Sequence, residues 1–400
     1  MKSQIYRKVL QSGMTIFFEK RDLPIVSVMI AVRNGGINEL PSEKGISHFI
    51  EHMLYKGTPT RSAKKIAEEI EKNGGELNGF TDEIITAYWC KIPSKHLNLA
   101  LDVLTDMVKN PLFDAKELEK ERKVIFEEIK MRKDNPQIYT FDHIQNELYS
   151  GTLGLNLIGT HKTMGKINRE KLIKKFKEIY RPNNMVLGIV GDANFSDIIN
   201  FAEKNFDNGK GKVPKIKFEL KNSSSIEKRK GIDQANLVLA YHVPLPPNKQ
   251  SYTAEVLNTL LAGGLSSRLF AEIREKRNLA YTIKGDSNIN RFFAYNLIYA
   301  GIKKENVLQV KKLILEEFKK VSKDLTEKEL LQVKEQLIGN HNISMEDSQM
   351  QLFNLISYEL DGDAREFYKF EERINAVKLQ DVKKMARIKK YSFFALVPEK

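Results

Sequence analysis

The spacing of apolar residues predicts a chain built from short strands and amphipathic helices. Residues 25–32 form a nearly continuous apolar run of strand length, which ends at the turn-forming segment 34–36. Apolar residues recur at helical spacing in 62–73, and Gly74-Gly75 ends that predicted helix. Residues 114–133 predict a long, strongly charged helix that begins at an Asp. The first half of the chain is therefore expected to contain both helices and strands.

The second half of the chain repeats this order of predicted elements. Residues 391–397 predict a closing strand that matches a buried strand at 185–190 in the first half. Between the halves, residues 209–230 are rich in Lys, Gly and Ser and predict a linker. Two halves of similar plan are the simplest account of this repeat. The predicted division is an N-terminal domain at 1–208, the linker at 209–230 and a C-terminal domain at 231–400.

The composition is that of a soluble globular protein, with 41% hydrophobic and 29% charged residues. Its longest apolar runs have the length of a strand, far below the ~20 residues that cross a membrane. No secretory signal is visible in the first residues, so we expect a cytoplasmic protein without a membrane partner. A length of 400 residues points to two or three domains.

The net charge of +13 raises the question of nucleic-acid binding. The lysines are dispersed and alternate with glutamates, as in residues 116–123, which is typical of solvated helix faces. We therefore expect no nucleic-acid partner. Cys90 is the only cysteine, which excludes an internal disulfide and a cysteine-rich zinc site. A metal in this protein would need histidine and carboxylate ligands.

The pentapeptide His48-Phe49-Ile50-Glu51-His52 is the strongest chemical signal in the sequence. In a helix, His48, Glu51 and His52 stand one turn apart on a single face. Two neutral imidazoles suit Zn²⁺, and a carboxylate between them can take a proton from a metal-bound water. The order His-x-x-Glu-His is the inverzincin pattern. The alternative is a buried helix with two ordinary histidines, but burying these groups without a metal or partners would be costly.

Two histidines leave a tetrahedral zinc site without its third protein ligand. The other five histidines occur singly, and each is more typical of a structural or exposed residue than of a ligand. The glutamates of the predicted helix at 114–133 are better placed, namely Glu119, Glu121, Glu127 and Glu128. Sequence spacing alone does not choose among them.

The pentapeptide and the later segment 121–129, Glu-Arg-Lys-Val-Ile-Phe-Glu-Glu-Ile, together resemble the pitrilysin and insulysin family of zinc metallopeptidases. The resemblance is to its short-chain branch, which contains mitochondrial processing peptidase and bacterial and archaeal relatives. It implies a third zinc ligand about 76 residues after the second histidine, and 128 − 52 = 76 selects Glu128. It also implies that Glu121, seven positions earlier, supports the zinc ligands from behind.

Segments outside the metal motif resemble the same family. Residues 77–81 match its edge strand beside the zinc, which pairs with extended substrate backbone. The substrate-binding residues implied by this match are Asn78, Gly79, Phe80 and Thr81. The family more often has Ala where this chain has Gly79. In the second half, Arg274 and Tyr281 match a pair that reaches the substrate at the zinc, and they are implied to act in catalysis.

The resemblance implies two similar α+β domains, each an antiparallel sheet with helices packed on one face. It implies a zinc-dependent endopeptidase in which Glu51 activates a zinc-bound water that attacks the scissile carbonyl of extended or unfolded peptides. Matching Gly57 to Gly263 by an offset of 206 places apolar residues and an amide opposite the metal motif. The C-terminal domain is therefore expected to contact the substrate but to lack zinc ligands.

The length of the chain bears on its partners. Relatives of about twice this length carry four such domains and enclose the substrate between two halves. The resemblance therefore implies a dimer, either of two identical chains or with a related subunit. The alternative function is a non-catalytic or regulatory assembly subunit of the same fold. A complete His-x-x-Glu-His motif with Glu128 argues against that alternative, because a scaffold needs no ligand set.

Overall fold

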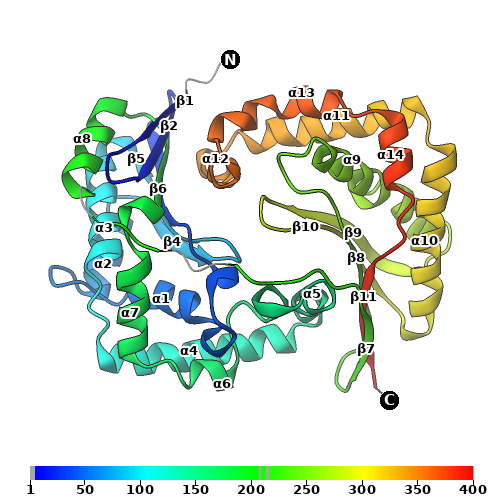
Figure 1. Cartoon of the computed structure of the whole chain (residues 1–400), viewed down its shortest axis with the longest axis horizontal. Helices are drawn as coiled ribbons and strands as arrows, with labels where there is room; N and C mark the ends of the chain where they lie inside the picture. Colours follow the sequence, from blue (N-terminus) through cyan, green and yellow to red (C-terminus); the bar gives the residue numbers. More distant parts are fainter. Residues whose placement is uncertain (1–4, 207–208, 213–215, 400) are drawn as a thin grey trace. The chain divides into compact units, whose positions relative to one another are not determined.

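The computed structural model describes residues 5–206, 209–212 and 216–399, which form two compact units (Figure 1). Each unit combines one sheet with helices, which confirms the predicted α+β fold of two similar domains. Unit 1 consists of Met1–Met131, Gly151–Lys217 and Ser344–Arg365, and unit 2 of Arg132–Ser150, Phe218–Ile343 and Glu366–Lys400. The division therefore differs from the sequence order predicted at 1–208 and 231–400, because each half of the chain gives one segment to the other unit.

The sheet of unit 1 has six strands in the order β1-β2-β6-β3-β5-β4. The strand bounds, in that order, are Ile5–Val9, Thr15–Lys20, Met185–Gly191, Ile25–Val32, Thr86–Pro93 and Glu76–Thr81. All neighbours are antiparallel except β2 and β6, which run parallel. Strand β4 lies at one edge and, among the described strands, pairs only with β5, so its outer backbone groups are those of an edge strand.

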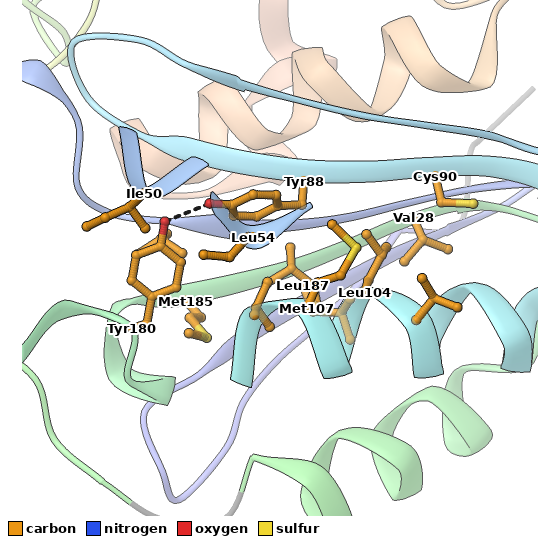
Figure 2. Packing of buried hydrophobic residues seen from close by; sticks show 14 of the residues in the cluster. Val28, Ile50, Leu54, Tyr88, Cys90, Leu104, Met107, Tyr180, Met185 and Leu187 are labelled. Atoms are coloured by element: carbon orange, nitrogen blue, oxygen red, sulfur yellow. Dashed lines mark hydrogen bonds between the residues drawn. The ribbon is translucent and has the colours of Figure 1, made fainter. Parts of the chain in front are cut away.

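Helices cover one face of this sheet and bury its apolar side chains (Figure 2). Alternate residues of β3 point to that face, and Val28 meets Leu104 and Met107 of a helix there. The hydroxyls of Tyr88 and Tyr180 lie 2.8 Å apart in a hydrogen bond within the same core. The helices with residues in this core are α1 (Ile46–Leu54), α2 (Ala63–Glu71), α3 (Leu97–Lys109), α4 (Ala115–Asp134), α6 (His161–Met164), α7 (Arg169–Ile179) and α8 (Phe195–Asn205).

The opposite face of the sheet carries α12 (Ser348–Asp361), which comes from late in the sequence. It packs on β6 and β3, and the hydroxyls of Ser27 and Ser348 lie 2.9 Å apart. Gly188 allows this approach, because a Cβ there would lie 2.8 Å from Leu352 Cδ1. The prediction of helices on one face thus omitted a helix on the other.

The sheet of unit 2 has five strands in the order β7-β11-β8-β10-β9. In that order the strands span Ser224–Arg229, Ser392–Pro398, Ala235–His242, Ala294–Ile302 and Ala280–Ile289. Only β7 and β11 run parallel, as β2 and β6 do in unit 1. Strand β7 lies inside the segment 209–230 that was predicted to be a linker, so part of that segment belongs to a sheet.

The helices of unit 2 repeat the arrangement of unit 1. Most pack on one face of the sheet around a second apolar core, whereas α5 packs on β11 and β8. Their bounds are α5 (Pro136–Leu148), α9 (Gln250–Ala262), α10 (Val307–Asp324), α11 (Glu327–Ser344), α13 (Phe370–Asn375) and α14 (Leu379–Met385). Among the described residues, no helix has the length and apolar character needed to cross a membrane.

Candidate metal centre

Helix α1 brings the two histidines of the predicted motif together. Its apolar residues, including Phe49, Ile50 and Met53, are buried in the core, so the opposite side of the helix carries the polar motif. His48 Nε2 and His52 Nε2 lie 3.3 Å apart on that side. The spacing of one helical turn therefore produces a pair of nitrogen donors that face the same point.

Helix α4 supplies an oxygen donor at the same point. Glu128 Oε2 lies 3.5 Å from the Nε2 atoms of both His48 and His52. Donors about 2.1 Å from a common tetrahedral centre are about 3.4 Å apart, so these three atoms have the spacing of zinc ligands. They form a group positioned to hold a metal ion, and two imidazoles with one carboxylate are a donor set that suits Zn²⁺.

Glu121 lies seven residues before Glu128 on α4 and holds the ring of His52 through the nitrogen that does not face the other donors. Its Oε2 lies 3.0 Å from His52 Nδ1, and its Oε1 lies 2.8 Å from Lys56 Nζ. A carboxylate that accepts a hydrogen bond from Nδ1 fixes the tautomer in which Nε2 can bind a metal. Lys56 was missed by the sequence analysis, because it lies in the turn after α1, which ends at Leu54, and helical spacing does not indicate its contact with Glu121.

Glu51 lies beside the donors but points to the edge strand. Its side chain is buried, and its Oε2 accepts a hydrogen bond of 2.7 Å from Thr81 Oγ1 of β4. Burial raises the pKa of Glu51 above its ordinary value, while the Thr81 hydroxyl and His52 oppose that rise. The carboxylate is consequently a stronger base than an exposed glutamate.

The predicted substrate strand is β4, at the edge of the sheet next to α1. Thr81 and Gly79 face α1, whereas Phe80 faces the other way and its ring lies 5.3 Å from that of Phe353 in α12. A Cβ on Gly79 would lie 2.5 Å from Tyr55 Oη and 2.7 Å from Ala87 O. The absence of a side chain at Gly79 therefore accommodates the hydroxyl of Tyr55, a second residue that the sequence analysis missed.

Arg274 and Tyr281 belong to unit 2. Arg274 is exposed on a short π-helical segment, Phe270–Glu275, and its guanidinium lies over the ring of Phe270. Tyr281 lies in β9 with 54% of its surface exposed. Both side chains are thus accessible within their unit, while the metal donors, Glu51, Glu121 and β4 are all brought together in unit 1.

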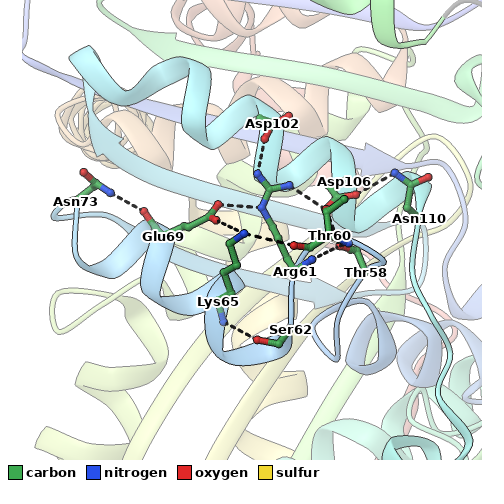
Figure 3. Close-up of polar contacts among 10 residues, drawn as sticks. All are labelled: Thr58, Thr60, Arg61, Ser62, Lys65, Glu69, Asn73, Asp102, Asp106 and Asn110. Atoms are coloured by element: carbon green, nitrogen blue, oxygen red, sulfur yellow. Dashed lines mark hydrogen bonds and ion pairs between the residues drawn. The ribbon is translucent and has the colours of Figure 1, made fainter.

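A polar network anchors the chain that follows α1 (Figure 3). The guanidinium of Arg61 forms ion pairs with Glu69 of α2 and with Asp102 and Asp106 of α3. Asp106 Oδ2 also accepts hydrogen bonds from the hydroxyls of Thr58, at 2.6 Å, and Thr60. The segment after the metal-binding helix is therefore tied to its two neighbouring helices.

Comparison with protein families matches both halves of the chain. Residues 16–161 match the model for insulinase, peptidase family M16, and residues 166–337 match the model for the peptidase M16 inactive domain. A protein of Bacillus subtilis named an uncharacterized zinc protease, YmxG, is 33% identical over 390 residues, which span 96% of this chain and 95% of the relative. The chain belongs to peptidase family M16. This finding confirms the resemblance stated from the sequence.

Other M16 relatives and solved structures extend this comparison. An uncharacterized zinc protease of Rickettsia felis is 30% identical over 85% of this chain and 84% of its own. A crystal structure of a protease from Helicobacter pylori superposes with a TM-score of 0.90 at 22% identity, covering 99% of this chain and all of that one. A crystal structure described as the peptidase M16 inactive domain from Pseudomonas fluorescens superposes with a TM-score of 0.88 at 19% identity, covering 99% of this chain and 98% of that chain. These structures support the fold.

Proposed function

We propose that this M16 protein is a zinc-dependent endopeptidase that hydrolyses extended or unfolded peptides. The observation that carries the proposal is the group of three donor atoms on His48, His52 and Glu128, spaced 3.3–3.5 Å apart, with the Glu51 carboxylate beside it. Relatives named zinc proteases support the choice of metal. A bound Zn²⁺ would supply a Lewis acid that polarises the substrate carbonyl and lowers the pKa of water.

Glu51 is the proposed general base and acid. Its Oε2 is oriented by Thr81, and its raised pKa favours taking a proton from the attacking water and returning it to the leaving amine. Glu121 acts through His52, whose ring it holds in place, and Lys56 forms an ion pair with Glu121. The chain's own residues thus provide the proton transfer and the fixed geometry of the donors.

Strand β4 is the proposed binding site for the substrate backbone. Its outer backbone groups have no strand partner in the described sheet, so a peptide can add as a further strand along 78–81. This mode requires an extended substrate backbone, which folded proteins rarely offer. Asn78 is exposed and Gly79 lacks a side chain, so neither blocks the approach of a peptide.

Residues of unit 2 complete the proposal. Tyr281 and Arg274 would grip the substrate carbonyl and stabilise its developing negative charge. We also propose that the protein works as a dimer, of two identical chains or with a related subunit, as the family resemblance of its sequence implies for a chain of this length. The dimer is testable by light scattering of the purified protein with and without peptide.

A digestion of mixed peptides tests the activity directly. The zinc content of the purified protein is measured first, and peptide cleavage is then followed by mass spectrometry with and without a chelator. We expect one zinc per chain, cleavage of unstructured peptides, and loss of cleavage on chelation that added Zn²⁺ reverses. A protein that holds zinc but cleaves none of the peptides would instead support the assembly-subunit alternative.

A further inference from the structure

Helix α1 lacks the usual side-chain cap at its N-terminus. Its first turn leaves backbone N–H groups without helical acceptors, and most helices satisfy them with a Ser, Thr, Asp or Asn at the cap position. Here the cap residue is Gly45, which has φ of 96° and makes no side-chain hydrogen bond. A Cβ at this position would lie 2.6 Å from Ile158 O, so the fold excludes a capping side chain there.

Glu39 replaces the missing cap from six residues upstream. Its Oε2 accepts a hydrogen bond of 2.9 Å from the Gly45 N–H, and its Oε1 accepts one of 2.7 Å from the Ser47 N–H. The carboxylate is only 4% exposed. A buried negative charge at this end of a helix interacts favourably with the helix dipole and with its unsatisfied N–H groups.

The segment around Glu39 also contacts the turn that follows the substrate strand. Lys44, itself buried, donates to Gly36 O at 2.9 Å and lies 3.5 Å from Glu83 Oε2. The N–H groups of Gly36 and Ile37 donate to the carbonyls of Asp82 and Glu83. One short stretch of chain therefore contacts both the first turn of α1 and the residues directly after Thr81.

We infer that Glu39 is a positioning residue, which fixes the first turn of α1 and thereby sets His48 and Glu51 against β4. His48 follows the capped Ser47 directly, so a shift of this turn moves a metal donor. Asn34 restrains the same turn, because its Nδ2 donates to Ser47 Oγ at 2.9 Å. The inference rests on the proposed zinc peptidase function and adds a residue outside the motif to it.

The test compares the variant Glu39→Gln with the control variant Glu71→Gln. Glu71 is an exposed glutamate of α2 without a described ion pair. Three quantities are measured on folded protein: the zinc dissociation constant, the visible absorption spectrum of the Co²⁺-substituted protein, and kcat with KM. For Glu39→Gln we expect zinc binding weaker by about tenfold, an altered Co²⁺ spectrum and a lower kcat with little change in KM. Glu71→Gln should match the wild type in all three.

A folded Glu39→Gln variant with wild-type zinc affinity and Co²⁺ spectrum would overturn the inference, even if its melting temperature fell. If that variant does not fold, hydrogen exchange of the wild type decides instead. The Gly45 and Ser47 amides should then exchange as slowly as the Phe49 amide inside the helix, and fast exchange would overturn the inference. A wild-type protein that binds zinc but cleaves no peptide would contradict only the proposed function, since the zinc and Co²⁺ measurements do not depend on hydrolysis.

Discussion

The two units share one architecture but differ in the chemistry of one helix. In unit 1, α1 lies against edge strand β4, and Thr81 donates to Glu51. In unit 2, α9 lies against edge strand β9, and Asn258 Nδ2 donates to Ser287 Oγ at 3.1 Å. The contact between helix and edge strand is retained, but in unit 2 an amide makes it instead of a carboxylate. The fold thus does not require the metal chemistry.

This correspondence also changes the residue offset by which the two halves of the sequence were matched. If Asn258 takes the place of Glu51, the offset is 207 rather than 206, and Glu255 and Thr259 stand opposite His48 and His52. Burial raises the pKa of Glu255 to about 7. Neither Glu255 nor Thr259 is an imidazole, which agrees with the match of this half to the M16 inactive domain.

The largest expected effect on kcat distinguishes Glu51 from Asn258, its counterpart in unit 2. Glu51→Gln should lower kcat by about 10²–10⁴-fold with zinc still bound, because it removes the general base but no metal donor. Asn258→Ala should leave kcat within about twofold, measured on protein that remains folded. Substantial activity of metal-replete Glu51→Gln would refute the role given to this carboxylate.

The next effect concerns the third donor. Glu128→Gln should weaken zinc binding because it removes a donor atom. The loss should exceed the roughly 10–100-fold that is typical when a residue hydrogen-bonded to a metal ligand is replaced. Its neighbour Glu127 is exposed and serves as the control, so Glu127→Gln should bind zinc normally. Zinc affinity measured by competition with a chelator checks both variants, and the reverse result would assign the third donor to Glu127.

Tyr281→Phe tests whether unit 2 takes part in the reaction. We expect turnover to fall by about 10–100-fold with unchanged zinc content, because one hydrogen-bond donor to the developing charge is lost. The side chain is 54% exposed, so the melting temperature should stay constant. Full activity would leave Tyr281 as a surface residue of β9.

A smaller effect compares the two edge-strand hydroxyls. Thr81→Ala should reduce kcat by about tenfold, since Glu51 loses the hydrogen bond that orients it. Ser287→Ala removes the equivalent hydroxyl of unit 2 and should leave kcat unchanged. Equal losses in the two variants would show that the effect arises from sheet stability rather than from Glu51.

The smallest effect is on stability in acid. Burial opposes the ionisation of Asp106, but hydrogen bonds from Thr58, Asn110 and Arg61 outweigh it and lower its pKa to about 2, against 3.8 as its ordinary value. The ionised Asp106 carboxylate stabilises the folded state by about 1 kcal/mol after solvent screening. This contribution is therefore complete above pH ~4 and lost as the pH falls through ~2. Urea unfolding of wild type and Asp106→Asn should give curves that differ at pH 5 and converge near pH 2. A constant difference across that range would contradict this account.

Much of the fold was predictable, because each local pattern agrees with the element that formed. The apolar run at 25–32 became β3, and the long charged helix became α4. The segment 209–230 was harder, since β7 is a polar strand at the edge of its sheet and lacks the alternation of a half-buried strand. The exchange of α5 and α12 between the units leaves no local signal, because a helix periodicity says which face is apolar but not which sheet it covers.

The sequence by itself determined that His48, Glu51 and His52 lie together, because residues at i, i+3 and i+4 of one helix must share a face. It left four glutamates of α4 as candidates for the third donor, and only the resemblance selected Glu128. The tertiary structure decided which carboxylate meets the histidines, because that depends on how α4 crosses α1. It also showed Glu39 at the first turn of α1, a contact between residues whose spacing carries no periodic signal. Local spacing thus specifies the motif, and packing between distant segments holds it in place.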